Sequence, residues 1–232
     1  MNTIYESGEY LSATETWHAE DSEWKAEQIS EILAKNNLSP LMLAEIGCGA
    51  GEILKHLSNR DELSNTEFYG FDISPQAIEL ATKNTSKNLN FKLNSLEQID
   101  LDLDVLMAID VFEHVPDYMG FLETCQSKAK YKIYHIPLDI HVSSVLRNAF
   151  VKQRASIGHI HYFTAESAIA TLEDTGHEIL SYQFTNVGTG LFRKHPSLKR
   201  ALANIPRYLI SVISARLSAR LFGGYSLLVL AK

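Results

Sequence analysis

A glycine-rich segment at 47–51 has the spacing GxGxG and follows directly on a short apolar run that ends at Ile46. Glycines at such a position let the chain turn tightly and let a ligand approach the backbone amides closely. The spacing differs from the GxGxxG dinucleotide fingerprint, because the third glycine comes one residue early, and no Gly-Lys-Ser/Thr follows to make a P-loop. Taken alone, the segment predicts a ligand-binding turn and leaves the ligand open.

An aspartate, Asp72, ends the next predicted strand, 21 residues after Gly51. A carboxylate at this place can accept two hydrogen bonds from a ribose diol. The alternative is that Asp72 caps the helix that opens at Pro75, but it stands three residues early for that role. The aspartate therefore favours a ligand that contains a nucleoside.

Histidines that follow the buried apolar runs are the candidates for acid–base chemistry. We select His114, which follows Glu113, and His159 as catalytic candidates. An imidazole with its ordinary pKa of about 6.5 can take a proton near neutral pH. The alternatives are structural: a local hydrogen bond at a helix start for His114, and a tie between loop and sheet for His159.

Three further histidines, His135, His141 and His161, raise the question of a metal ion. Together with His159 their spacings match no standard zinc pattern, and no cysteine lies nearby. We therefore expect no metal site.

The elements that must position these residues alternate between strands and helices. This alternation predicts right-handed βαβ units and a mostly parallel sheet covered on both faces, with ligands bound outside the carboxyl ends of the strands. The predicted strands span 41–46, 68–72, 90–93, 104–109, 132–136, 179–184 and 225–230. The predicted helices span 22–36, 52–58, 75–83, 117–128 and 164–174, with Thr164 as a cap and Gly176 after the last of them.

Four motifs in this order resemble those of class I S-adenosylmethionine-dependent methyltransferases. They lie at 44–51, 70–81, 104–115 and 158–179, and the later two resemble the branch that includes ubiquinone-pathway and many glycan or small-molecule methyltransferases. The resemblance covers about 40–186 and the final strand. It implies an α/β, Rossmann-like fold with a seven-stranded, mostly parallel sheet, helices on both faces and an antiparallel last strand.

The resemblance also implies S-adenosylmethionine as the cofactor and a set of contacts to it. The amides of 47–51 would face its methionine part, Glu45 its ammonium group, Asp72 its ribose and Ile73 its adenine. Many relatives carry an aspartate near position 95, where this chain offers only an amide or a hydroxyl oxygen. The implied cofactor-binding residues are Glu45, Gly47, Cys48, Gly49, Gly51, Asp72, Ile73, Asn94, Ser95, Leu96, Ile109, Asp110 and Val111.

The function expected is methyl transfer to a small-molecule or lipid-like acceptor by in-line displacement. The protein's task in such a reaction is to align the acceptor and to exclude water. Two alternatives stay open: a nucleotide-binding (NAD) oxidoreductase of Rossmann type, and a cofactor-binding protein without catalytic activity. Nucleic acid is not expected as the acceptor, because no motif for a flipped base is present and most of the chain is acidic.

Composition places the chain among ordinary globular proteins. With 45% hydrophobic and 21% charged residues over 232 positions, it is neither disordered nor fibrous. Two cysteines cannot make a disulfide framework and no signal-peptide pattern opens the chain, so we expect a cytoplasmic protein. The best apolar stretch, 208–215, is far shorter than the roughly 20 residues of a spanning helix.

Charge is distributed unevenly along the chain. Residues 179–232 contain no Asp or Glu and carry a charge of +8, whereas 1–178 carry −15. The pattern predicts a helix that starts at Pro206, with an apolar arc bordered by Arg216 and Arg220. Such an arc packs against the core, covers an amphiphilic acceptor, or lies on a membrane surface as a peripheral contact.

We expect a single methyltransferase domain over 1–232. Within it, 1–38 is expected to form an N-terminal helical lid, in which Tyr10, Trp17 and Trp24 could close over the cofactor. Two insertions, 137–163 and 187–222, exceed what a minimal version of the fold needs and are expected to cover the acceptor site. The oligomeric state cannot be read from the sequence.

Overall fold

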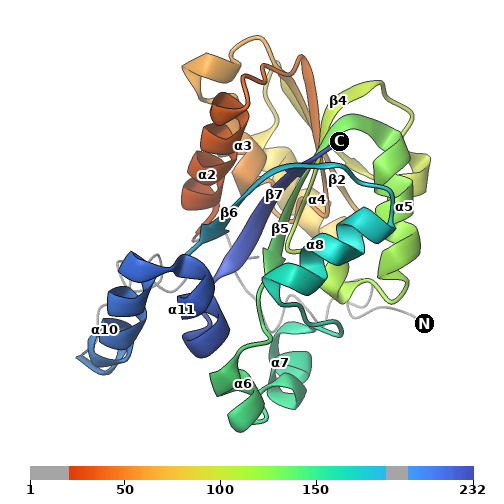
Figure 1. The fold of residues 1–232 in the computed structure, drawn as a ribbon. Helices are drawn as coiled ribbons and strands as arrows, with labels where there is room; N and C mark the ends of the chain where they lie inside the picture. The colour runs from red at the N-terminus through yellow and green to blue at the C-terminus, as the bar shows by residue number, and fades with distance from the viewer. Residues whose placement is uncertain (1–20, 187–197) are drawn as a thin grey trace.

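The computed structural model describes residues 21–186 and 198–232, with the side chains of 198–204 and 206 excepted (Figure 1). Tyr10 and Trp17 of the expected lid lie outside the described residues. The described chain forms the expected sheet of seven strands, in the order β3-β2-β1-β4-β5-β7-β6. The strands are β1 (Met42–Ile46), β2 (Glu67–Asp72), β3 (Leu89–Leu93), β4 (Leu103–Ile109), β5 (Ala129–Pro137), β6 (Ile179–Thr185) and β7 (Ser226–Ala231).

Six of the seven strands run in the same direction, and β7 alone is reversed. β1 pairs in parallel with β2 and β4, so the carboxyl ends of these three central strands meet at one edge. β7 lies antiparallel between β5 and β6. The expectation of a mostly parallel sheet with an antiparallel last strand is confirmed.

Helices cover both faces of this sheet (Figure 1). Ile29, Leu54 and Ala81 belong to one apolar core, and Leu122 and Leu172 to the other. The first core therefore joins α2 (Ser22–Lys35), α3 (Glu52–Ser58) and α4 (Pro75–Ala81) to the sheet, and the second joins α5 (Tyr118–Lys128) and α8 (Ala165–Asp174). Short 3₁₀ turns are η2 (Asp61–Leu63), η3 (Thr82–Asn84), η4 (Leu96–Gln98) and η5 (Phe112–His114).

Local signals place two helix starts as expected. Thr164 begins α8, because its hydroxyl accepts a hydrogen bond from the Ser167 N–H in a capping box. Ser74, not Asp72, caps α4, since its hydroxyl accepts from the Ala77 N–H. Asp72 is thereby left for another role.

The second insertion differs from the expected single helix that starts at Pro206. It forms α10 (Leu198–Ile213), which contains Pro206, and a separate helix α11 (Ala215–Phe222). The break has a physical cause: Ser214 is extended, and its hydroxyl accepts a hydrogen bond from the Leu217 N–H as the cap of α11. The apolar residues before and after Ser214 therefore lie on two helices instead of one arc.

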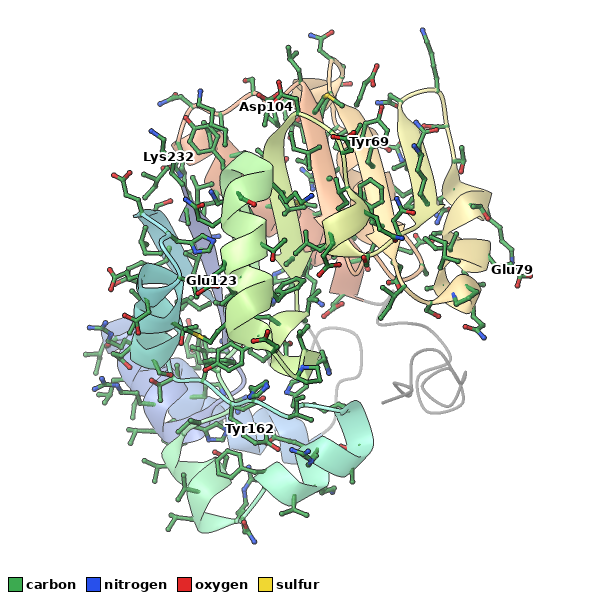
Figure 2. All side chains as sticks on the ribbon, turned by 90° about the vertical axis from the view of Figure 1, so that its right-hand side faces the viewer. Tyr69, Glu79, Asp104, Glu123, Tyr162 and Lys232 are labelled. Atoms are coloured by element: carbon green, nitrogen blue, oxygen red, sulfur yellow. The ribbon has the colours of Figure 1, made fainter. Side chains whose placement is uncertain are left out.

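The first insertion adds α6 (Val142–Leu146) and α7 (Phe150–Ile157). Both insertions lie at one end of the molecule (Figure 1). Figure 2 shows Tyr162 at this end and Asp104 and Lys232 at the opposite one. Within the described residues, the structure contains no helix that is long and apolar enough to cross a membrane.

Candidate active site

A cavity of about 290 Å³ opens at the carboxyl ends of β1, β2 and β4, where α2 also contributes to its wall. This is the edge at which parallel α/β sheets bind ligands. The lining residues are Ser22, Lys25, Glu45, Gly47, Cys48, Gly49, Ala50, Glu52, Ile53, Asp72, Ile73, Ile109, Asp110, Val111, His114, Val115 and Pro116.

The glycine loop between β1 and α3 adopts a conformation that side chains disfavour. Gly47, Gly49 and Gly51 have φ values of 71°, 53° and 75°. A Cβ on Gly47 would lie 2.7 Å from a methyl group of Val111, and one on Gly51 would collide with the ring of Phe91. Gly47 and Gly51 are therefore required by close packing as well as by the turn.

Asp72 holds this loop to the end of β2. Its carboxylate accepts hydrogen bonds from the N–H of Gly49 at 2.9 Å and from the N–H of Ser74 at 2.8 Å. Burial raises the pKa of Asp72, although these two donors oppose the shift. The side chain lines the cavity, so a carboxylate already oriented by backbone donors faces the ligand space.

Glu45 brings a buried acid to the same cavity. Only 2% of the residue is exposed, and its Oε2 has no hydrogen-bond partner among the described residues. Burial raises the pKa of Glu45 to about 8, with Lys25 opposing and Asp72 and Asp110 adding to the shift. A buried carboxyl that lacks a partner is suited to a cationic ligand group.

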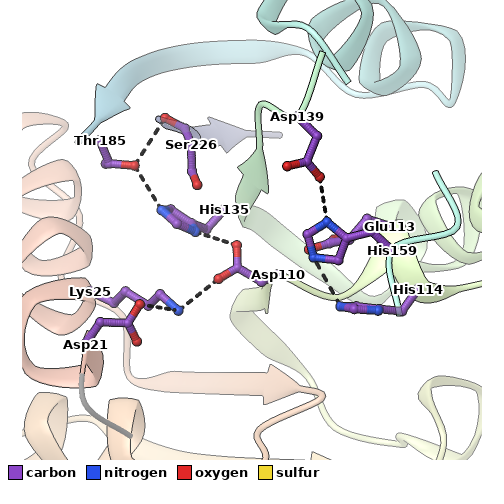
Figure 3. A network of polar contacts seen from close by, with 10 residues as sticks. All are labelled: Asp21, Lys25, Asp110, Glu113, His114, His135, Asp139, His159, Thr185 and Ser226. Atoms are coloured by element: carbon purple, nitrogen blue, oxygen red, sulfur yellow. Dashed lines mark hydrogen bonds and ion pairs between the residues drawn. The ribbon is translucent and has the colours of Figure 1, made fainter. Parts of the chain in front are cut away.

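Asp110 joins the sheet to the N-terminal helix through a network of charges (Figure 3). Its carboxylate lies 2.8 Å from Nζ of Lys25 and 2.7 Å from Nδ1 of His135, and Lys25 also pairs with Asp21 at 3.1 Å. Although burial alone would raise the pKa of Asp110, the charges of His135 and Lys25 hold it well below its usual range. Thr185 lies 2.9 Å from Nε2 of His135.

Thr185 and Asp110 hold the ring of His135 from its two sides. The Thr185 hydroxyl lies 2.9 Å from Nε2 of His135 and donates to the carbonyl of Ser226 at 3.1 Å. Asp110 lies 2.7 Å from Nδ1 of the same ring. Asp110 is thus placed between Lys25 and His135, and the network ties α2 to the central strands beside the cavity.

A second polar cluster lies behind His114 (Figure 3). Nδ1 of His114 donates to the Gly158 carbonyl at 3.0 Å, and Nδ1 of His159 donates to Asp139 at 2.5 Å. With Nδ1 engaged in this way, the Nε2 of each ring faces Glu113 and lies 4.0 Å from its Oε1. Glu113 is fully buried, both its carboxyl oxygens lack a hydrogen-bond partner within the described chain, and burial raises its pKa.

This cluster could hold a cation. Glu113, His114 and His159 offer one ligand atom each within 4.8 Å of one another, with Asp139 orienting one imidazole from behind. The sequence spacing led us to expect no metal site, and that expectation stays a prediction. Burial, with the charges of Asp110 and Asp139 adding to it, raises the pKa of Glu113 and so favours the neutral carboxyl group when no cation is bound.

The structure brings most of the predicted site residues to the cavity. Ten lie in its lining: Glu45, Gly47, Cys48, Gly49, Asp72, Ile73, Ile109, Asp110, Val111 and His114. Five others lie outside that lining. Gly51 precedes α3, Asn94 extends β3 by donating its N–H to the Asp72 carbonyl, and Ser95 caps η4. Leu96 belongs to the apolar core, and His159 lies behind His114 with ring centroids 4.9 Å apart.

Sequence reasoning missed four residues of these two clusters. Lys25 and Ser22 line the cavity from α2, which was expected only to act as a lid. Glu113 was noted only as the residue before His114, and Asp139 was given no role. Their positions directly after β4 and β5 were a usable signal, because the carboxyl ends of neighbouring parallel strands meet.

Comparison with known proteins assigns this fold and site to a family. A model of the methyltransferase domain family matches residues 17–182. The ubiquinone biosynthesis O-methyltransferase of Bradyrhizobium diazoefficiens is 31% identical over 104 residues, which are 43% of this chain and 40% of that protein. That of Colwellia psychrerythraea is 23% identical over 110 residues, 44% of this chain and 43% of that protein. The matched part spans about two fifths of these curated relatives.

Two solved structures illustrate the similarity of fold. Magnesium protoporphyrin IX methyltransferase from Synechocystis PCC 6803 with bound SAH superposes with a TM-score of 0.60 at 16% identity, covering 90% of this chain and 82% of that one. Cyclopropane synthase MmaA2 from Mycobacterium tuberculosis gives 0.59 at 18% identity, covering 88% and 84%. These likenesses show the fold.

Because the family model matches more than half of its length, the chain belongs to the class I S-adenosylmethionine-dependent methyltransferases. It is an enzyme of the class that uses S-adenosylmethionine as its cofactor. Neither the NAD-dependent oxidoreductase nor the non-catalytic alternative is favoured. The sheet order agrees with this, since an antiparallel strand lies between β5 and β6 where a dinucleotide-binding sheet continues in parallel.

Proposed function

We propose that this chain transfers a methyl group from S-adenosylmethionine to a small molecule with an apolar body. The observation that carries the proposal is the single cavity described above. It joins the buried carboxyl group of Glu45, whose Oε2 has no hydrogen-bond partner within the described part of the chain, and an oriented carboxylate, Asp72, to a wall that ends at His114, Val115 and Pro116. The first part suits a zwitterionic nucleoside, and the second suits an apolar acceptor.

The cofactor's charged groups have matching partners in the cavity. Glu45 would accept the ammonium group, whose charge would lower the raised pKa of this carboxyl. Asp72 would accept the ribose hydroxyls through the oxygen lone pairs that Gly49 and Ser74 leave free. Ile73, which is 45% exposed, would pack on the adenine.

Bound S-adenosylmethionine supplies a methyl group that its positively charged sulfur makes electrophilic. The protein holds the acceptor in line with that methyl group and keeps water out. His114 lines the cavity, and its Nε2 can accept a proton from an acceptor hydroxyl or amine because Nδ1 already donates to Gly158. His159, which Asp139 orients, would support the ring of His114 from behind, since the two ring centroids are 4.9 Å apart.

The chain would work as one domain with three covering parts. Support for the N-terminal lid is that Ser22 and Lys25 of α2 line the cavity. Support for 137–163 as an acceptor cover is that it contributes Asp139 and His159 to the cluster behind His114. For 187–222 the support is the packing of Gly223, at the end of α11, against the ring of His141 before α6.

The names of the relatives favour an amphiphilic acceptor. They refer to ubiquinone biosynthesis, magnesium protoporphyrin IX and mycolic acid cyclopropane synthesis, and these compounds share large apolar frameworks. We extend this chemistry to the present chain as a class: a compound with one nucleophilic group on an apolar body.

Two measurements test the proposal. Isothermal titration should show that S-adenosylmethionine binds and that NADH does not, and labelled methyl groups should pass to amphiphilic phenols or hydroxy-lipids. His114→Ala should lower turnover at least tenfold with little change in cofactor affinity, whereas His56→Ala on α3, outside the cavity, should change neither. Absence of S-adenosylmethionine binding, or preference for NADH, would overturn the proposal.

A further inference from the structure

The α10 helix turns an apolar face toward solvent. Ile205, Tyr208, Leu209, Val212 and Ile213 are 52%, 65%, 61%, 72% and 83% exposed. Their spacing of three and four residues puts all five side chains on one side of the helix. An apolar stripe of this length normally faces a core, so its exposure is a feature to be explained.

The first insertion repeats the pattern at the same end of the molecule. Val142, Val145 and Leu146 of α6 are 49%, 57% and 81% exposed at the same helical spacing, and Val151 of α7 is 69% exposed. α6 packs beside α11 (Figure 1), because the ring of His141 meets the backbone of Gly223. Two insertions far apart in the sequence thus build one surface, which we call the insertion end.

Charge separates the insertion end from the rest of the chain. Within the two insertions, the segments 140–163 and 187–222 contain ten Lys and Arg residues and not one of the 28 acidic residues. Arg147, Lys152 and Arg154 of the first insertion are exposed. Arg216 and Arg220 of the second pair with a single carboxylate, Glu166 of α8, at 2.9 and 2.8 Å, so together they keep a net positive charge.

We propose that the insertion end docks on an anionic lipid surface, with α10 lying in the plane of the interface. Exposed apolar side chains beside cations, with no acidic residue in either segment, are the combination that binds such surfaces. A protein partner would need an acidic surface and a wide apolar surface placed to match the cations and the apolar stripe of the insertion end. An anionic lipid layer supplies both, because its acidic headgroups lie over apolar acyl chains. Tyr208, half apolar and half polar, suits the boundary between them.

This placement has a consequence for the site. The first insertion begins where β5 ends and carries Asp139, two residues beyond that strand, which orients His159. Docking therefore holds the acceptor side of the molecule close to the layer in which an apolar acceptor would dissolve. The docking inference itself does not depend on the proposed function, because it rests on side chains outside the cavity.

Vesicle co-sedimentation of the full chain tests the inference. The protein should pellet with vesicles that mix phosphatidylcholine and phosphatidylglycerol, less with phosphatidylcholine alone, and less at high salt. Val212→Glu with Ile213→Glu should lower the partition coefficient at least about tenfold. Two apolar side chains that docking would bury in the lipid are then replaced by negative charges, which acidic headgroups repel. Leu146→Glu should lower it less and tests the first insertion separately.

The matched control is Leu41→Glu with Leu180→Glu. It makes the same change of charge at exposed apolar side chains, 64% and 41% accessible, that lie outside both insertions. It should leave vesicle binding within about twofold, and circular dichroism should show all variants folded. Absence of binding to the anionic vesicles, or an equal loss in the control pair, would overturn the inference. A third result would also overturn it: a wild-type protein that does not bind vesicles but forms a dimer, which Val212→Glu with Ile213→Glu dissociates. The apolar face would then be a contact between two copies of the chain.

Discussion

The loops at the carboxyl ends of β1, β2 and β4 hold their ligand-facing groups by hydrogen bonds and ion pairs, whereas the insertion end presents apolar side chains to solvent. Asp72 is fixed by two backbone donors and Asp110 by Lys25 and His135. Val212 and Ile213 of α10 are more than two-thirds exposed. The first region is preorganised for one chemically defined ligand, and the second is suited to apolar surfaces in general. Because the two regions use different residues, variants in one region should leave binding at the other unchanged: cofactor binding at the cavity and vesicle binding at the insertion end.

The largest effect is expected from Gly49→Val. Gly49 has a φ of 53°, which a branched side chain resists, and its N–H donates to Asp72. Cofactor affinity should fall by about 3 kcal/mol or more, over 100-fold. Isothermal titration measures this, and vesicle binding by the same variant should not change. Normal cofactor affinity in a folded Gly49→Val protein would show that the site is misplaced.

Asp72→Ala should weaken S-adenosylmethionine binding by about 2–3 kcal/mol, because a charged acceptor of hydrogen bonds is lost. Asp72→Asn should cost less, since the amide oxygen keeps one acceptor. Part of the loss in affinity comes from the ribose contacts and part from the hydrogen bonds that Asp72 makes within the loop. Thermal unfolding of the cofactor-free variants reports the second part, so the comparison of the two variants separates it from the first. Equal affinities for wild type and Asp72→Ala would remove the ribose assignment.

Lys25→Met should destabilise the protein by about 2 kcal/mol. Loss of a buried ion-pair partner usually costs about 3–5 kcal/mol, but Asp110 keeps His135 and remains 28% exposed, which reduces the penalty. Lys35→Met on the same helix is the control, because its pair with Glu31 is exposed and should contribute under about 0.5 kcal/mol. Urea unfolding measures both. If the two variants lose the same stability, the Asp110 network does not hold α2 to the sheet.

The two regions also differ in how far sequence alone could describe them. The cofactor loops depend on features local in the chain: glycines where φ is positive, and an aspartate at a strand end. The insertion end depends on contacts between distant residues, such as Arg216 with Glu166 and His159 with Asp139, which no spacing encodes. The single helix expected from Pro206 was wrong because the apolar spacing continues across Ser214, whose hydroxyl caps a new helix.

A smaller effect is expected from pH. Burial raises the pKa of Glu45 from 4.5 to about 8, so the cofactor-free protein holds a proton there that the cofactor's ammonium group must displace. Affinity for S-adenosylmethionine should therefore rise with pH, up to about tenfold per unit between about pH 6 and 7.5, before an α-amino group itself titrates near about 7.7–8.0. Glu45→Gln should flatten this slope.

The raised pKa of Glu45 also makes the stability of the folded protein depend on pH. The folded state keeps the Glu45 proton that the unfolded state releases above 4.5, so this contribution is full at low pH and is lost as pH rises toward about 8. Urea unfolding of the cofactor-free protein, compared with Glu45→Gln, isolates it. An affinity slope that persists in Glu45→Gln would show that another group releases the proton.

The smallest effect is expected from Arg216→Ala with Arg220→Ala. The sequence suggested that these arginines border the acceptor, but both pair with Glu166 on α8, and their side chains are 49% and 56% exposed. Exposed pairs of this kind contribute under about 1 kcal/mol each, so stability should fall little. The acceptor KM should stay within about threefold, roughly 0.65 kcal/mol, and cofactor affinity should not change. A tenfold rise in KM with unchanged stability would mean that the arginines leave Glu166 to bind an anionic group of the acceptor, and the insertion end would then belong to the active site as well as to the surface.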